Sequence, residues 1–162
     1  MHWQAICDNP IFNDLPFKCE TDRWGHVVMS PATNKHSWLQ GEILYRLRQH
    51  CQEGYAFPEC SIQTSQGVKV ADVVWGSQDF FQRNHLDNPY QQAPEIVVEI
   101  LSPSNSIAEM TEKQQLYFAC GAKEFWLCDE KGILQFHKPH ECLLRSEWVI
   151  DFPVKLQLPF SL

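Results

Sequence analysis

The sequence predicts an α/β protein, of the α+β kind, in which helices flank a mixed central β-sheet. Segments with the pattern of strands and segments with helical spacing are interleaved along the chain, which is typical of such a sheet. Two runs, VADVVW at 70–75 and IVVEIL at 96–101, are apolar over nearly their whole length, as expected of central strands covered on both faces. The length of 162 residues favours a single domain over 1–162.

The first third of the chain is expected to hold a hairpin and a helix. Residues 1–16 carry turn signals and no clear element, whereas 17–30 predict a hairpin that turns near 22–25. Apolar residues at helical spacing predict a helix over 35–52, with Asn34 as its N-cap. The apolar positions of that helix are Leu39, Ile43, Leu44, Leu47 and Cys51.

Short apolar segments bounded by turn residues predict the remaining strands. They lie at 55–63, 68–75, 96–101, 124–128, 133–137, 148–151 and 154–158. The stretch 76–93 has no apolar period and is expected to be an irregular excursion or a lid. A second helix is expected between Ser106, which opens a capping-box pattern with Glu109, and Gly121.

Composition and charge restrict the classes of function. The net charge of −7 counts against strong non-specific binding of nucleic acid but is compatible with a local basic groove. Seven scattered cysteines without a CxxC pair indicate reduced thiols. The start of the chain does not read as a signal peptide, and no apolar run is long enough to cross a bilayer, so we expect a cytoplasmic protein that does not enter a membrane.

One cluster has the ligand types of a zinc site. His137, His140 and Cys142 lie close together in the sequence. A loop that carries these residues by chance is the favoured interpretation.

Two carboxylates interrupt the predicted central strands. Asp72 shares a strand face with Val70 and Val74, and Glu99 interrupts the run at 96–101. If the two strands are neighbours, both acids can converge, and a divalent cation would remove the cost of burying them together. Hard oxygen ligands favour magnesium, manganese or calcium over zinc. The alternative is that each acid lies near a strand end, solvated or paired with Arg or Lys.

The helix after Glu99 offers a cation. Lys113 lies one turn before Tyr117, so both side chains can reach the edge of the same strand. The alternative is a solvated pair between Glu109 and Lys113, four residues apart on the helix.

The chain resembles the restriction endonuclease family known as domain of unknown function 820, within the PD-(D/E)XK nuclease superfamily. The resemblance rests on ADVVW at 71–75, PEIVVEILSPSNS at 94–106, EKQQLYFACGAKEFWLCD at 112–129 and the earlier CETDRWGHVVMSPA at 19–32. It extends from about residue 17 to about residue 158 and implies a restriction-endonuclease-like fold.

The resemblance implies a set of site residues. Asp72 matches the first catalytic Asp, although Ala71 replaces the usual Pro, and Glu99 matches the acid of the second motif. The superfamily Lys would stand two residues after Glu99, where this chain has Leu101. In this family the Lys matches Lys113 in the following helix.

Glu20 in the hairpin matches the additional acid of the family more loosely, with a solvated strand-end Glu as the alternative. The expected cofactor is Mg²⁺ or Mn²⁺, held by Asp72, Glu99 and the backbone carbonyl of Ile100, with Tyr117 supporting Lys113.

The expected activity is metal-dependent hydrolysis of phosphodiester bonds in nucleic acid, with DNA as the favoured substrate. An alternative is a catalytically weak or inactive nucleic-acid-binding or regulatory module on the same fold, and a third is an oligomeric interaction protein. A homodimer would allow one site per subunit to cut each strand. The basic residues that could line a local groove for the substrate are Lys35, His36, Arg46, Arg48, Arg83 and His85.

Overall fold

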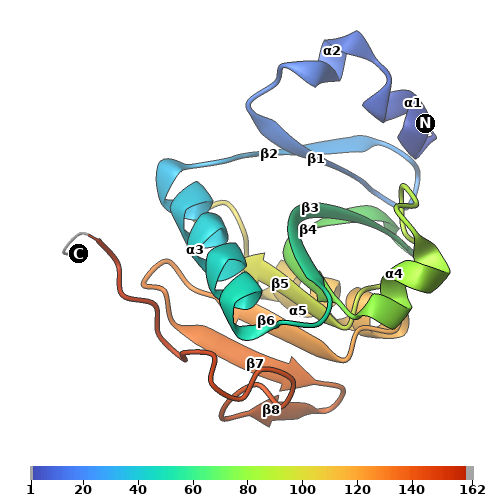
Figure 1. Ribbon diagram of the computed structural model, residues 1–162. Coiled ribbons are helices and arrows are strands. Elements are labelled where there is room, and N and C mark those ends of the chain that lie inside the picture. Colours follow the sequence, from blue (N-terminus) through green and yellow to red (C-terminus); the bar gives the residue numbers. More distant parts are fainter. Residues whose placement is uncertain (1, 160–162) are drawn as a thin grey trace.

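The computed structural model describes residues 2–159 and contains two β-sheets and five helices within that range (Figure 1). The elements follow in the order α1 (Trp3–Cys7), α2 (Pro10–Asn13), β1 (Phe17–Thr21), β2 (Val27–Pro31), α3 (Asn34–His50), β3 (Tyr55–Thr64), β4 (Gly67–Gly76), α4 (Gln78–Asn84), β5 (Ile96–Ile100), α5 (Ile107–Ala119), β6 (Glu124–Cys128), β7 (Leu134–Lys138) and β8 (Glu141–Leu143).

The larger sheet has six strands in the order β3-β4-β5-β6-β7-β8, and the smaller one pairs β1 with β2. Neighbouring strands of the larger sheet are antiparallel except β5 and β6, which are parallel. The parallel pair requires a crossover, and α5 provides it. The predicted mixed central sheet flanked by helices is confirmed.

The two faces of the sheet are covered by different helices. Helix α3 packs against one face and α5 lies on the other (Figure 1). Successive residues of β5 therefore contact opposite layers: Val98 belongs to the cluster with Ile43 of α3, and Val97 belongs to the cluster with Tyr117 of α5. Both strands with apolar runs are buried over nearly their whole length because a helix covers each face.

Several predicted boundaries differ from the structure. The N-cap of α3 is Thr33, whose hydroxyl accepts a hydrogen bond from the His36 amide, so the prediction of Asn34 was wrong. The helix ends at His50, two residues earlier than expected. Gly54 then turns the chain with a φ of +101°, and a Cβ there would lie 2.4 Å from the Gly76 carbonyl oxygen.

Short elements were missed. Residues 1–16 contain α1 and α2, and the expected irregular stretch 76–93 contains α4, whose N-cap is Ser77. Strand β8 was not predicted either. Helices of four to seven residues are too short to display a helical period in the sequence.

The last two predicted strands are wrong. Residues 148–151 form bends and turns, because the amides of Trp148 and Val149 donate to the Ser146 hydroxyl instead of to a neighbouring strand. Residues 154–158 make a single bridge, between Lys155 and Ile133. Prolines in this region also limit ladder formation.

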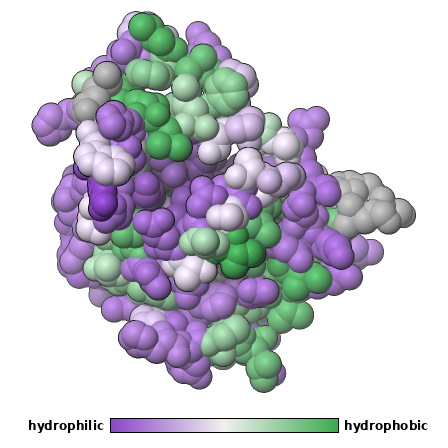
Figure 2. All heavy atoms as spheres, turned by 180° about the vertical axis from the view of Figure 1, so that it is seen from behind, coloured by the Kyte–Doolittle hydropathy of each residue, from purple (hydrophilic) through white to green (hydrophobic). Residues whose placement is uncertain are grey.

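Helices α1 and α2 lie with the β1–β2 hairpin at one end of the molecule (Figure 1). Figure 2, which gives the view from behind, shows apolar surface at this end. The apolar residues that are exposed there include Ile11, Leu15, Phe17, Val28 and Met29. In the described residues, no helix is long and apolar enough to cross a membrane.

Candidate active site

The candidate site lies where β4 and β5 separate. Their ladder ends at the pair Val73 and Val98, and the next residues outward on the two strands are Asp72 and Glu99. Beyond this point the amide of Ile100 donates to Asp72 Oδ2 at 2.7 Å instead of to a strand carbonyl. Both carboxylates are almost completely buried, with 1% and 2% of their residue surface exposed. We call this opening between β4 and β5, which Asp72 and Glu99 line, the fork. It brings the two predicted acids together.

Strand β1 closes the fork on the side of β4. Before Val73, β4 does not pair with β5, so its backbone amides on that edge need other acceptors. The Val68 amide donates to the Thr21 hydroxyl at 2.7 Å, and the Val70 amide donates to Glu20 Oε1 at 2.9 Å. Gly67 permits this docking, because a Cβ there would lie 2.4 Å from the Asp22 carbonyl oxygen. Glu20 is thereby held beside the two strand acids.

Helix α5 supplies Lys113. The predicted capping box is present, since the Ser106 hydroxyl accepts from the Glu109 amide and the Glu109 carboxylate accepts from the Ser106 amide. The Lys113 ammonium lies 2.7 Å from Glu20 Oε1 and 3.2 Å from Glu99 Oε1. Lys113 therefore points into the fork, and the alternative of a surface pair with Glu109 is not what the structure contains.

Tyr117 lies one turn after Lys113 on the same helix. Its hydroxyl donates to Glu99 Oε1 at 2.6 Å, and the side chain is fully buried. The Tyr117 hydroxyl contacts Glu99 and not Lys113, so it acts on the acid rather than on the cation.

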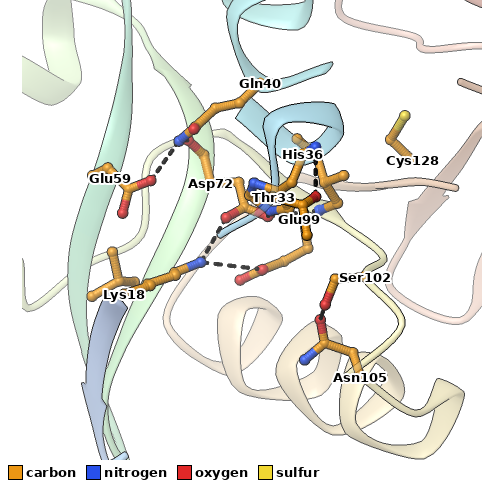
Figure 3. Close-up of polar contacts among 12 residues, drawn as sticks. Lys18, Thr33, His36, Gln40, Glu59, Asp72, Glu99, Ser102, Asn105 and Cys128 are labelled. Atoms are coloured by element: carbon orange, nitrogen blue, oxygen red, sulfur yellow. Dashed lines mark hydrogen bonds and ion pairs between the residues drawn. The ribbon is translucent and has the colours of Figure 1, made fainter. Parts of the chain in front are cut away.

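A second ammonium enters the fork from β1. The Lys18 Nζ atom lies 2.7 Å from Asp72 Oδ1 and 3.6 Å from Glu99 Oε2, between the two carboxylates (Figure 3). Sequence reasoning missed Lys18. Its position two residues before Glu20 on a strand, which places both on one face, was the available signal.

Helix α3 contributes two polar side chains, four residues apart on one helix face. The His36 Nε2 atom lies 3.2 Å from Asp72 Oδ2. Gln40 donates to the Asp72 backbone carbonyl at 2.8 Å and to Glu59 Oε1 at 2.5 Å. Glu59 stands opposite Asp72 on β3 with a φ of +57°, a strained conformation for a residue other than glycine. Sequence reasoning considered His36 only for a groove and did not identify Gln40 or Glu59.

These side chains surround a small cavity of about 100 Å³. Three carboxylates, those of Glu20, Asp72 and Glu99, face the ammonium groups of Lys18 and Lys113. These five groups together carry one net negative charge, and the carboxylates of Glu59 and Glu109, which also line the cavity, add to it. A carboxylate cluster of this kind attracts a cation more strongly in a buried setting than it would in water.

The environment moves the pKa values of the two strand acids in opposite directions. Burial favours the neutral form of Asp72, but the Lys18 ammonium and the His36 ring outweigh it and hold the pKa of Asp72 below its ordinary value. Burial raises the pKa of Glu99, and Lys113 and Lys18 offset this only in part. Paired acids with separated pKa values are typical of functional sites.

Glu20 and Lys113 are held in their charged forms. Burial opposes the charge on Glu20, but Lys113 and Lys18 lower its pKa. Burial likewise opposes the charge on Lys113, and Glu99 and Glu20 raise its pKa despite it. The charges in the fork therefore depend on one another.

The donor set fits a hard divalent cation. Asp72 Oδ1 and Glu99 Oε2 both lie within reach of one cation, since the Lys18 ammonium contacts both. Mg²⁺ is commonly bound by one or two carboxylates and completed by water and substrate oxygens. Within residues 2–159, no group of three or more His, Cys, Asp or Glu side chains is arranged to hold a metal ion, and this includes His137, His140 and Cys142.

The six basic residues considered for a groove do not form one surface. His36 lines the candidate site, whereas Arg48 and His85 line a separate cavity with Tyr55. Arg46 pairs with Glu42 at 2.6 Å on its own helix. The proposed groove is therefore not formed by this set.

Comparison with known proteins identifies the family. The Uma2 family model, described as "Putative restriction endonuclease", matches residues 13–157, and no curated protein gave a match. A solved structure described as a putative nuclease belonging to DUF820, from Anabaena variabilis ATCC 29413, is similar with a TM-score of 0.66. The two sequences are 21% identical over 76% of this chain and 73% of that one, which supports a shared fold. Because the family model spans most of the chain, the protein belongs to the Uma2 family of putative restriction endonucleases.

Proposed function

We propose that this protein is an endonuclease that hydrolyses phosphodiester bonds in DNA with the aid of Mg²⁺ or Mn²⁺. The observation that carries the proposal is the convergence of Asp72, Glu99 and Lys113 in one buried fork. Membership of a restriction endonuclease family supports the reaction class. Charged side chains are seldom buried unless they are paired, and here three carboxylates and two ammonium groups surround one small cavity.

In this proposal Asp72 and Glu99, with the backbone carbonyl of Ile100, hold the metal ion. A divalent ion bound there would lower the pKa of a water molecule and offset charge on the phosphate. The Ile100 amide and His36 fix the orientation of the Asp72 carboxylate. The Tyr117 hydroxyl does the same for Glu99.

Lys113 is proposed to act on the attacking water or on the charge that develops at the phosphate. Its ammonium is held by Glu20 and Glu99, so it is already oriented towards the metal-binding acids. Glu20 is proposed as the residue that positions Lys113, since its Oε1 atom is also fixed by the Val70 amide. These contacts give no support to a second metal position at Glu20.

The acidic net charge of the chain is compatible with a nucleic-acid substrate under this proposal. The cavity is lined by more carboxylates than ammonium groups, so a divalent ion would offset negative charge there and place a positive centre beside the phosphate. A local positive centre can attract a phosphate even on an acidic protein.

Cleavage of supercoiled plasmid provides the test. The wild type should nick DNA with Mg²⁺ or Mn²⁺ and not with chelator, and Asp72→Asn and Glu99→Gln should reduce cleavage to background. The exposed Glu141→Gln makes the same charge change outside the site and should cleave like the wild type. Absence of metal-dependent cleavage of plasmid, single-stranded DNA and RNA by the wild type would contradict the proposal.

The second candidate function is a nucleic-acid-binding or regulatory module with weak or no catalysis. Two observations favour it: Lys18 lies between the two acids, and Leu101 stands where the superfamily has its Lys. Calorimetric titration with Mn²⁺ discriminates between the candidates. A catalytic site should bind Mn²⁺ in a manner that Asp72→Asn abolishes, whereas an inactive site should bind none there.

The homodimer stays a prediction. The exposed apolar side chains of α2 and the β1–β2 hairpin, among them Ile11, Phe17 and Met29, are a surface on which it can be tested. Sedimentation of the wild type and of Met29→Lys would show whether that surface joins two copies.

A further inference from the structure

Lys18 lies in the place that a bound cation would need. Asp72 and Glu99 each have one oxygen that is already engaged: Asp72 Oδ2 contacts the Ile100 amide and His36, and Glu99 Oε1 contacts Tyr117 and Lys113. The other two oxygens, Asp72 Oδ1 and Glu99 Oε2, have the Lys18 ammonium as their polar contact in the described part of the chain.

We propose that Lys18 is the built-in counter-cation of this site and that a divalent metal ion binds by exchange, displacing the Lys18 ammonium from Asp72 and Glu99. The inference rests on the proposed metal-dependent function and deepens it. It assigns a role to a residue that neither the sequence patterns nor the proposed catalytic set required.

Geometry excludes simultaneous occupation. A Mg²⁺ ion bound by these two oxygens would lie about 2.1 Å from each, in the space where the ammonium now lies 2.7 Å from one and 3.6 Å from the other. Two positive centres in that space would also repel each other strongly, because the acids around them are buried. The metal ion and the Lys18 ammonium are therefore alternatives.

The position of Lys18 allows it to leave. It belongs to β1 of the separate two-stranded sheet, so its side chain can swing out without breaking the six-stranded sheet. The Lys18 side chain keeps 15% of its surface exposed, whereas those of Asp72 and Glu99 keep 1% and 2%. The flexible stem of lysine permits such a movement. Exchange of one cation for another also avoids leaving two buried carboxylates without a partner.

Amine labelling of the wild type tests the displacement directly. A lysine-reactive ester with mass-spectrometric readout should modify Lys18 slowly in chelator and several-fold faster when saturating Mn²⁺ is added. Lys138, which pairs with Glu141 and Glu147 outside the site, is the internal control and should not respond to Mn²⁺. Metal binding without any change in Lys18 labelling would overturn the inference.

Calorimetry with Mn²⁺ tests the competition. Lys18→Met removes the charge at similar size and should raise Mn²⁺ affinity at least about tenfold, whereas Lys18→Arg keeps the competing cation and should stay near the wild type. Lys69→Met is the matched control, since Lys69 donates to the Thr21 carbonyl and contacts neither acid. Circular dichroism checks that each variant is folded, and the labelling experiment does not depend on any variant.

The outcomes separate the two proposals. If the wild type binds Mn²⁺ through Asp72 but Lys18→Met binds no more tightly, the exchange is wrong and the proposed metal site stands. If neither the wild type nor Lys18→Met binds Mn²⁺ in the millimolar range, the metal site itself is wrong, and the exchange falls with it.

Discussion

The Lys113 ammonium lies 2.7 Å from Glu20 Oε1, although 93 positions separate the two residues in the sequence. The same Glu20 oxygen accepts the Val70 amide at 2.9 Å. One carboxylate oxygen thus ties the helix that supplies the cation to the strand that supplies Asp72. This arrangement fixes where the ammonium stands relative to the fork, and it makes Glu20 a positioning residue.

We expect Glu20→Gln to slow DNA cleavage about tenfold, whereas Lys113→Ala should cost roughly 10²- to 10³-fold. The amide still fills the space but holds the ammonium less strongly, because it lacks the negative charge. Single-turnover cleavage measures the rates, and calorimetry should show Mn²⁺ affinity little changed in Glu20→Gln. If Glu20 acts through Lys113, the Glu20→Gln substitution should have little further effect in the Lys113→Ala background. Additive losses would contradict the positioning role.

Tyr117→Phe should lower the free energy of unfolding by about 1.5 to 3 kcal/mol, because it removes a buried hydrogen bond to a carboxylate. Urea unfolding measures the change. Tyr45→Phe is the matched control: its hydroxyl contacts Gln49 on the exposed side of α3, and its loss should change stability by no more than about 0.5 kcal/mol. Equal effects of the two substitutions would show that the contact with Glu99 contributes nothing special.

The sequence predicted the helices and strands that are long enough to display a hydrophobic period. The apolar runs that contain Val73 and Val98 became adjacent central strands, and the capping pattern at Ser106 gave the start of α5. Elements of three to seven residues, such as α4 and β8, escaped because so few positions cannot display a period. Residues 148–151 were mistaken for a strand because their backbone partners are side chains, which no pattern in the segment reveals.

The site could be anticipated only where a residue was out of place in its own segment. Asp72 and Glu99 are acids within apolar strands, and this misfit drew attention to them. Lys18 and Gln40 sit in segments where polar residues are ordinary, and their partners are 54 and 32 positions away. The convergence of such residues depends on the tertiary fold, so local pattern could not indicate it.

Glu124 is a buried acid with a structural task. Its carboxylate accepts hydrogen bonds from the Trp126 indole, the Ser146 hydroxyl and the amides of Glu147 and Trp148. We expect Glu124→Ala to destabilise the protein by roughly 3 kcal/mol or more, because it leaves several buried donors without an acceptor. Urea unfolding measures this effect.

The control for Glu124 is Glu141→Ala, which removes an exposed carboxylate paired with Lys138. It should change stability by no more than about 0.5 kcal/mol. Mn²⁺ affinity should survive in folded Glu124→Ala, since Glu124 contacts none of the residues in the fork. A loss of metal binding in the folded variant would show that the site depends on the C-terminal segment.

The Asp72 carboxyl should make the free energy of unfolding depend on pH in the acidic range. Its pKa in the folded protein lies below the ordinary value of 3.8, because the Lys18 ammonium and the His36 ring outweigh the effect of burial. The unfolded chain therefore binds the proton more readily than the folded one, and this contribution to stability is present above pH 3.8 and is lost as the pH falls towards the folded pKa. We expect the free energy of unfolding of the wild type to fall more steeply between about pH 5 and about pH 2 than that of Asp72→Asn. Asp151→Asn, an exposed substitution with the same charge change, should keep the steep wild-type dependence in urea unfolding across that range. Parallel curves for the wild type and Asp72→Asn would mean that the contacts of Asp72 with Lys18 and His36 do not stabilise the folded state.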